Sequence, residues 1–145
     1  MQELPHNYKV EALAEPDGEA ALSCERLGTM PFAAPAEFGG PGDCWSPETL
    51  LVAAVAGCFI LSFRAIARAS KFPWTSLQCE VEGTLERVEG VMKFTGFVVH
   101  ATLGVPQDAD EKRARLLLGK AEKTCLVTNS LSAETRLDAE IRNAG

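Results

Sequence analysis

The apolar run of residues 50–63 constrains the fold of this 145-residue chain more than any other segment. It reads Leu-Leu-Val-Ala-Ala-Val-Ala-Gly-Cys-Phe-Ile-Leu-Ser-Phe, and Arg64 and Arg68 come directly after it. Because a membrane-spanning helix needs about 18–20 apolar residues, this shorter run predicts a core helix. The helix is apolar nearly all round, so both of its sides need cover. One small sheet would cover one side, and a second subunit is the simplest candidate for the other.

Both ends of this helix carry sequence signals. Ser46 is a candidate N-cap, and Pro47 suits the first helical position, where a missing N–H costs nothing. Glu48 adds a negative charge in the first turn, where it interacts favourably with the helix dipole. The Phe72-Pro73 pair predicts that the helix ends near Ser70.

The remaining segments predict strands, turns and two more helices. Alternating apolar residues indicate strands over residues 7–14, 19–25, 77–88, 93–103 and 132–141. Turn residues at 16–18 and 89–90 join the first four strands into two hairpins. The Pro- and Gly-rich residues 30–43 predict a loop, and residues 106–123 and 125–131 predict helices.

The length suits one domain over residues 1–145, and the order of elements is that of an α+β fold with antiparallel hairpins. With 14 basic against 20 acidic residues and no basic stripe, nucleic acid is not an expected partner. The first residues have no positive segment that leads into an apolar one, so no secretory signal is expected. We therefore expect a cytoplasmic protein without a membrane partner.

The chain has five cysteines: Cys24, Cys44, Cys58, Cys79 and Cys125. Their odd number and irregular spacing, without a Cys-x-x-Cys pair, argue against a disulfide framework and a structural zinc site. A general disulfide oxidoreductase is disfavoured for the same reason. We expect neither a metal nor a cofactor. In a reducing compartment, a disulfide in this chain would be transient rather than structural.

Cys58 lies in the middle of the apolar helix, and Cys125 lies at the start of the short helix over residues 125–131. Each has two readings: a small hydrophobic side chain in the core, or a thiol that reacts as its thiolate. Backbone donors near a helix start would favour the thiolate of Cys125. A disulfide between the two would require their Cα atoms within about 7 Å, which their spacing does not reveal. Cys24 and Cys79 fall in strand patterns and are expected to pack within the fold.

Three motifs in a fixed order resemble one known family. They are Glu37-Phe-Gly-Gly40, then Ser46-Pro-Glu-Thr-Leu-Leu51 closed by Ala-Gly-Cys58, and then Ala121-Glu-Lys-Thr-Cys125 followed by Asn129-Ser-Leu131. With the helix and strands between them, they resemble the osmotically inducible protein C and organic hydroperoxide resistance (OsmC/Ohr) family over residues 35–141. The resemblance implies antiparallel sheets wrapped around a long central helix in an intertwined homodimer, with two active sites at the subunit interface.

The resemblance also implies thiol-dependent reduction of peroxides. In such enzymes the cysteine that matches Cys58 attacks the peroxide, and the cysteine that matches Cys125 resolves the product as a disulfide. A glutamate that matches Glu48 pairs with an arginine that helps to activate the thiol. The apolar surroundings of Cys58 favour organic hydroperoxides over hydrogen peroxide, and an external dithiol would regenerate the enzyme.

The arginine is where this sequence departs from the family pattern. In the peroxidases it lies in the first hairpin, but residues 12–22 contain none, and Arg26 is the one arginine before the long helix. Glu48 precedes Cys58 by ten positions, about 15 Å along a helix axis, so it would act indirectly or across a dimer. The alternative to an enzyme is the same fold as a binding or structural dimer in which Cys58 is unreactive.

Overall fold

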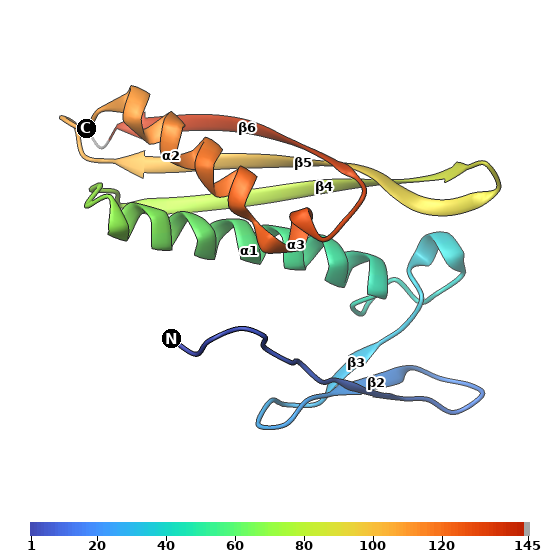
Figure 1. Cartoon of the computed structure of the whole chain (residues 1–145). Helices are drawn as coiled ribbons and strands as arrows, with labels where there is room; N and C mark the ends of the chain where they lie inside the picture. Colours follow the sequence, from blue (N-terminus) through green and yellow to red (C-terminus); the bar gives the residue numbers. More distant parts are fainter. Residues whose placement is uncertain (144–145) are drawn as a thin grey trace. The chain divides into compact units, whose positions relative to one another are not determined.

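A computed structural model describes residues 1–143 of the chain as an α+β protein with two three-stranded sheets and a long central helix (Figure 1). The elements in chain order are β1 (Glu11–Leu13), β2 (Ala20–Ser23), β3 (Met30–Phe32), a 3-10 turn (Ala36–Phe38), α1 (Pro47–Ala69), β4 (Ser76–Val88), β5 (Val91–Val105), α2 (Glu111–Thr124), α3 (Leu126–Asn129) and β6 (Glu134–Asn143). Residues 1–50 form one compact unit, and a second unit begins at residue 51.

The first unit contains an antiparallel sheet in the order β1-β2-β3. Its first hairpin confirms the prediction from residues 7–25, although both strands are shorter than expected. The prediction of a loop from residue 30 was wrong, because β3 pairs with β2 through Met30↔Leu22 and Phe32↔Ala20. A three-residue strand centred on Pro31 gives no alternating signal, and proline is tolerated there because β3 is an edge strand.

After β3 the chain passes through the Glu37-Phe-Gly-Gly40 motif, where the backbone is closely packed. A Cβ atom on Gly40 would lie 1.7 Å from the carbonyl oxygen of Ala34, so no other residue fits there without movement of the backbone. The Gly40 N–H donates to the Pro35 carbonyl at 3.0 Å and closes the turn. Position 40 of this motif therefore requires glycine for packing of the backbone.

The first unit lacks a hydrophobic core of its own. Of residues 1–50, all of which the structure describes, Ser46 alone is buried. The three residues of β1 are exposed, and large side chains such as Tyr8, Val10 and Leu13 are open to solvent. A small sheet needs a covered apolar face to be stable, so this sheet requires a surface to pack on.

The second unit contains a mixed sheet in the order β4-β5-β6. β4 and β5 form the expected antiparallel hairpin, and its turn at Glu89 and Gly90 has positive φ angles at both residues. β6 is parallel to β5, which corrects the expectation of antiparallel pairing throughout. The reason is α2, which carries the chain back along the sheet before β6 begins, as a parallel connection requires.

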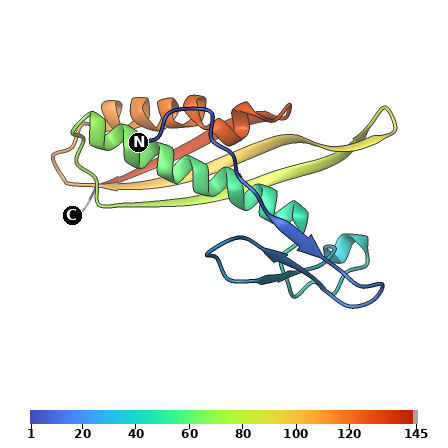
Figure 2. The same cartoon turned by 60° about the horizontal axis from the view of Figure 1, so that its bottom comes forward.

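The core lies between one face of this sheet and the helices α1 and α2 (Figure 2). The buried residues of β5 all have odd numbers, so they point to the same face. The fully buried side chains of the cluster come from β5 and from both helices: Val55, Phe59, Phe63, Phe97, Val99, Leu103, Val105 and Leu118. Each large apolar side chain buried here contributes about 1.5–3 kcal/mol to stability.

Helix α1 begins and ends where the sequence predicts. The Ser46 Oγ accepts the Thr49 N–H at 3.1 Å, and the Thr49 Oγ1 accepts the Ser46 N–H at 2.9 Å, so the cap is reciprocal. At the other end, the Arg113 side chain of α2 donates to the Ser70 carbonyl, and its guanidinium lies 5.7 Å from the centre of the Phe72 ring. Both ends of the helix are therefore fixed by named contacts.

One side of α1 packs on the sheet, and the other side is left uncovered by the described residues of the second unit. Val55, Phe59, Phe63 and Ala67 form the buried stripe at four-residue intervals, whereas Leu61 on another face is 59% exposed. By length and composition alone this 23-residue helix could also cross a membrane, although core helices of soluble proteins pass the same test. The sheet supplies the predicted cover for one side, and the cover of the other side stays a prediction.

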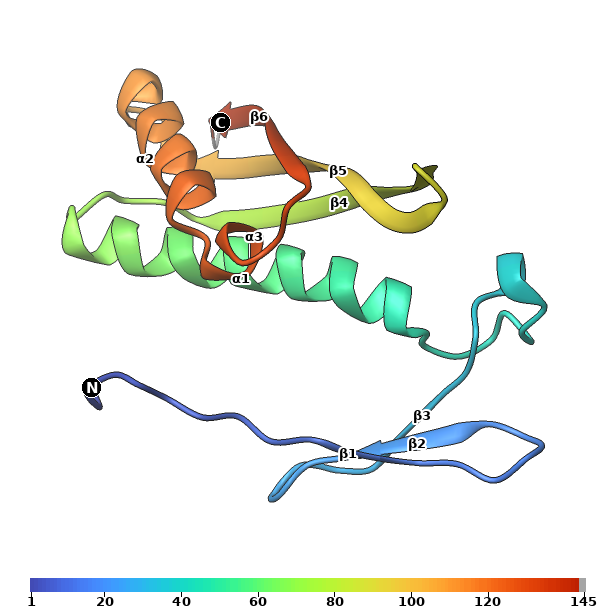
Figure 3. The same cartoon turned by 45° about the vertical axis from the view of Figure 1, so that its right-hand side comes forward.

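Helix α2 starts later than the sequence suggested. It begins at Glu111 rather than near Pro106, because the Asp110 side chain caps it by accepting the Arg113 N–H at 3.1 Å. It ends at Thr124, and α3 follows as a single turn after Cys125. Figure 3 shows α3 beside the middle of α1, where Cys58 lies.

Candidate active site

Cys58 lies at the middle of α1, next to the buried stripe but not in it. Its neighbour Phe59 is buried, whereas Cys58 itself is half-buried. One helical turn further on, the Ser62 hydroxyl lies 3.9 Å from the Cys58 sulfur. The Cys58 side chain therefore lies beside the apolar core and is also partly accessible to solvent.

Cys125 lies where α2 ends and α3 begins, and it serves as a cap residue of both helices. Its side chain is buried, with 1% of its surface exposed. Its carbonyl accepts the Asn129 N–H at 3.0 Å and the Thr128 hydroxyl at 3.2 Å. These bonds hold the backbone of Cys125 in place, and with it the direction of the thiol.

The fold brings Cys58 and Cys125 together. The Cys125 thiol is a hydrogen-bond donor to the Cys58 sulfur, and the backbone N–H groups of Val127 and Leu126 point at the same sulfur. All of these groups belong to the second unit. A contact between two thiols with two backbone N–H donors beside it differs from purely hydrophobic packing. Whether Cys58 reacts as a thiolate stays a prediction.

The pKa of Cys58 is lowered from the ordinary thiol value of 9.0. Burial raises the pKa, but four donors outweigh it. They are, in order of effect, the Val127 N–H, the Cys125 thiol, the Ser62 hydroxyl and the Leu126 N–H. Because a thiolate is stabilised by donors that point at it, the site favours the reactive form of Cys58.

The pKa of Cys125 moves in the opposite direction. Burial raises the pKa of this thiol, and the neighbouring Cys58 raises it further, whereas the Thr128 N–H and hydroxyl lower it. The expectation that donors at the start of the short helix favour a Cys125 thiolate was therefore wrong. For Cys125 the effect of burial on the pKa is larger than that of the Thr128 donors. The N–H groups of Leu126 and Val127 point at the Cys58 sulfur. When the pair loses one proton, these shifts favour the negative charge on Cys58 and the remaining proton on Cys125.

A third thiol lies near the pair. Cys79 on β4 stands opposite Ala101 and packs on the core, as its strand position suggested. Burial, and then the charge of Cys125, raise the pKa of Cys79 to about 11. At neutral pH this thiol is therefore protonated, and it forms part of the apolar surroundings of Cys125.

Glu48 is not near Cys58 within the chain. Both residues lie in the uninterrupted helix α1, so about 15 Å of helix separates them. Glu48 is half-buried, and its Oε1 atom is shielded from solvent without a hydrogen-bond partner among the described residues. A shielded carboxylate oxygen without a donor is unusual in a folded protein.

The donors to Cys58 within residues 1–143 do not include an arginine. Arg26 lies in the turn between β2 and β3, with a φ of 67°, and forms no ion pair with a described residue. Arg64 and Arg68 are exposed on α1 and form none either. Sequence reasoning missed the donors that are present. Ser62 could have been found from its four-residue spacing after Cys58, whereas backbone N–H groups leave no sequence signal.

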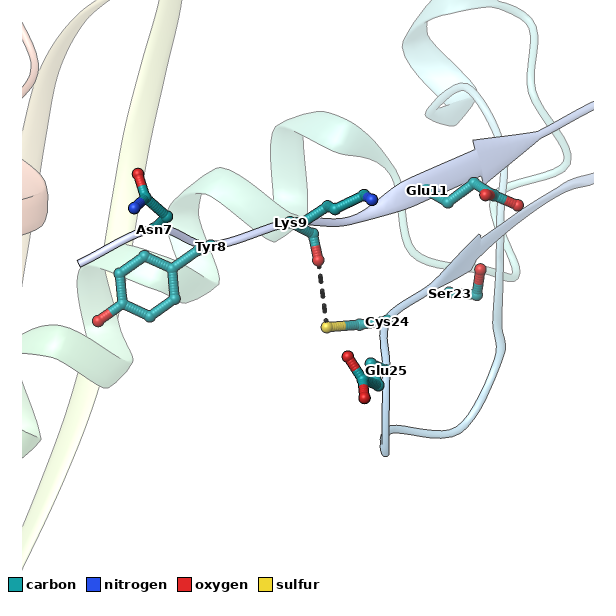
Figure 4. Close-up of a pocket in the computed structure, with 7 residues that line it drawn as sticks. All are labelled: Asn7, Tyr8, Lys9, Glu11, Ser23, Cys24 and Glu25. Carbon is teal, nitrogen blue, oxygen red and sulfur yellow. Dashed lines mark hydrogen bonds between the residues drawn. The ribbon is translucent and has the colours of Figure 1, made fainter.

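Cys24 belongs to the first unit, whereas Cys58 and Cys125 belong to the second. Its thiol donates to the Lys9 carbonyl at 3.4 Å, at the edge of a depression of about 620 Å³ (Figure 4). The depression is lined by side chains from the N-terminal segment and the end of β2: Asn7, Tyr8, Lys9, Glu11, Ser23, Cys24 and Glu25. Within the described residues, no cluster of three or more metal-ligating side chains is present there or elsewhere.

Comparison with known proteins decides the family. The family model described as OsmC-like protein matches residues 40–140, which include Cys58, Cys125 and the helices that carry them. The chain belongs to the OsmC-like family. This confirms the resemblance that the three sequence motifs indicated.

Several relatives of this OsmC-like protein have names that refer to peroxides. Peroxiredoxin OsmC of Escherichia coli (strain K12) is 26% identical over 128 residues, which cover 87% of this chain and 88% of the relative. An organic hydroperoxide resistance protein of Xanthomonas axonopodis pv. citri (strain 306) is 29% identical over 114 residues, 76% of each chain. A solved structure of an OsmC-like protein of unknown function from Vibrio cholerae has a TM-score of 0.84 at 15% identity and covers 93% of this chain and 99% of that one, which shows the shared fold.

Proposed function

We propose that this OsmC-like protein is a thiol-dependent peroxidase that reduces organic hydroperoxides. One observation carries the proposal: Cys58 and Cys125 are in contact, and their pKa values are shifted in opposite directions. A nucleophile with a lowered pKa beside a protonated second thiol is the arrangement that sulfenic acid chemistry needs. The names of the relatives from Escherichia coli and Xanthomonas support the same reaction class.

The reaction has three steps. The Cys58 thiolate attacks the terminal oxygen of the peroxide, the O–O bond breaks, and the departing alkoxide takes a proton to become the alcohol. Cys58 is then a sulfenic acid. The Cys125 thiol displaces water from it, and a Cys58–Cys125 disulfide forms. An external dithiol reduces this disulfide by thiol exchange and is itself oxidised to a disulfide, which restores both thiols.

The side of α1 next to Cys58 supports a preference for organic hydroperoxides. Ala54, Gly57 and Leu61 lie within one turn of Cys58 and are exposed in the single chain. An apolar surface beside the nucleophile favours the alkyl part of an organic hydroperoxide, which hydrogen peroxide lacks. The reaction needs neither a metal nor an organic cofactor. The reducing conditions of a cytoplasm would keep both thiols available.

The proposal includes a homodimer. The open side of α1 is apolar, and the sheet of the first unit has no core, so two surfaces of the chain need cover. A second copy of the chain, intertwined with the first, would cover both. In such a dimer Glu48 would act across the interface, and its unpartnered Oε1 would accept a hydrogen bond from an arginine, for which Arg26 is a candidate.

A peroxidase assay with two variants tests the proposal. Cys58→Ser should abolish turnover of cumene hydroperoxide with a small dithiol as reductant. Cys125→Ser should allow one turnover, after which Cys58 is over-oxidised to the sulfinic acid because no neighbouring thiol traps the sulfenic acid. Cys24→Ser is the control, because Cys24 lies in the first unit and bonds the Lys9 carbonyl. Equal activity in wild type and Cys58→Ser would refute the assignment.

The absence of an arginine from residues 12–22 favours a second candidate, a binding or structural dimer with an unreactive Cys58. The same assay separates the two. In this second case the wild-type protein would consume no hydroperoxide, and its thiols would stay reduced.

A further inference from the structure

The proposed reaction needs a donor to the Cys58 thiolate, and the donors among the described residues do not include an arginine. The donors among the described residues are therefore those on which the reaction depends, and two of them are side chains, the Cys125 thiol and the Ser62 hydroxyl. Because the proposed reaction uses the Cys125 thiol to resolve the sulfenic acid, Ser62 is the side chain that can serve as a donor alone. Ser62 lies four residues after Cys58 on α1, which places it on the same face one turn along.

The Ser62 hydroxyl is aimed at the thiol. Helical side chains point toward the N-terminus of the helix, so the side chain at position 62 covers the turn that carries position 58. The Oγ–Sγ distance is 3.9 Å, and Ser62 is half-buried. A serine inside a helix commonly returns its hydroxyl to a backbone carbonyl one turn earlier. Here the Cys58 sulfur is its partner among the described residues.

We propose that Ser62 is a catalytic hydrogen-bond donor that stabilises the Cys58 thiolate during attack on the peroxide. This inference rests on the proposed peroxidase function. The hydroxyl keeps its proton and donates a hydrogen bond to the sulfur as the thiol ionises, and this bond weakens as negative charge moves from the sulfur to the departing alkoxide. Nothing needs to move, because both side chains belong to the same rigid turn of α1.

The size of the effect follows from the geometry. A hydrogen bond to a charged group is stronger than a neutral one, but 3.9 Å is long even for sulfur. The Val127 and Leu126 N–H groups and the Cys125 thiol also face Cys58, from the α2–α3 junction, and they remain when Ser62 is changed. Cys79, behind Cys125, is the other titratable group nearby. Loss of the hydroxyl should therefore lower the thiolate population at neutral pH about fivefold rather than abolish it.

The test follows alkylation of Cys58 by iodoacetamide from about pH 5 to pH 9, read peptide by peptide with mass spectrometry. Ser62→Ala should slow alkylation of Cys58 at neutral pH about fivefold and move the pH profile upward. Ser62→Thr, which keeps a hydroxyl at the same position, should retain most of the wild-type rate. Ser132→Ala is the matched control, because Ser132 is exposed and lies outside the helices. Ultraviolet absorbance of the thiolate gives a second measure on the same variants.

Two results would overturn the inference. An unchanged pH profile in Ser62→Ala would show that the hydroxyl does not stabilise the thiolate. An equal loss in Ser62→Ala and Ser62→Thr would show that packing, not the hydroxyl, is responsible. Failure of the proposed function gives another result. The wild-type protein would then not turn over hydroperoxide, while the alkylation rates of wild type, Ser62→Ala and Ser62→Thr would still differ as described.

Discussion

The Cys125 thiol donates a hydrogen bond to the sulfur of Cys58, although the two residues lie on elements far apart in the sequence. Helix α1 carries one thiol, and the junction of α2 and α3 carries the other. The Val127 N–H and then this contact outweigh burial and lower the pKa of Cys58, whereas burial and then this contact raise the pKa of Cys125. These opposite shifts support the proposed roles, in which Cys58 attacks the peroxide and Cys125 resolves the product.

The first prediction is an order of reactivity with pH. The thiolate fraction of a cysteine rises as the pH passes through its pKa, so a lowered pKa gives reactivity at lower pH. Cys58 should therefore be alkylated below the ordinary thiol value of 9.0, Cys125 above it, and Cys79 last, near its pKa of about 11. Peptide-resolved alkylation across this range measures the order. Reaction of Cys125 before Cys58 would contradict the assigned roles.

The second prediction concerns stability in alkali. Because the pKa of Cys79 is raised to about 11 by burial, the folded state keeps this proton where the unfolded state, near 9.0, has lost it. The contribution of the protonated Cys79 thiol to the free energy of unfolding is therefore fully present below pH 9 and declines as the pH rises toward 11. The loss amounts to about 1–2 kcal/mol after allowance for the partial exposure of the side chain. Urea unfolding of wild type and Cys79→Ala over this range tests it. A parallel decline in both proteins would exclude Cys79 as the cause.

The sequence predicts those parts of the fold that depend on local signals. The Ser46 and Pro47 signals located the start of α1 because caps are local, and the turn at Gly90 located the β4–β5 hairpin for the same reason. The parallel pairing of β6 could not be seen, because it depends on the path of α2 across the sheet.

In the candidate site, too, the sequence predicts the residues but not the effects that depend on tertiary structure. The motifs selected Cys58 and Cys125, but their contact and the direction of each pKa depend on burial and on the N–H groups of Val127 and Leu126. Such tertiary effects leave no trace in the spacing of residues. The raised pKa of Cys125 is the clearest case, since the local argument from the helix start predicts the opposite sign.

The third prediction tests the packing of α1 on the sheet. A Cβ atom on Gly83 would lie 2.9 Å from the Phe97 ring and 3.0 Å from Val52, so Gly83→Ala should destabilise the fold by about 1–3 kcal/mol. Gly119→Ala on α2 is the matched control, because its Cβ would meet nothing within 4 Å. That change should stabilise α2 by about 1 kcal/mol. Urea unfolding measures both, and equal stability of the two variants would contradict the packing described here.

The fourth prediction concerns the proposed dimer. If a second copy covers the open side of α1, light scattering should give twice the 15.6 kDa mass of one chain. Leu61→Arg should then weaken the dimer, because it places a charge on the covered apolar face. Leu116→Arg, at a residue of α2 that is 70% exposed, should leave the mass unchanged. A wild-type protein of single-chain mass would contradict the proposal.

The central claim is that Cys58 and Cys125 act as a redox pair, and one measurement tests it most directly. The reduced protein is mixed with one equivalent of cumene hydroperoxide, quenched, digested without reduction and analysed by mass spectrometry. The account predicts a peptide pair joined by a Cys58–Cys125 disulfide, formed with loss of two thiols and absent from Cys58→Ser. Unchanged free thiols, or a disulfide that leaves out Cys58, would contradict it.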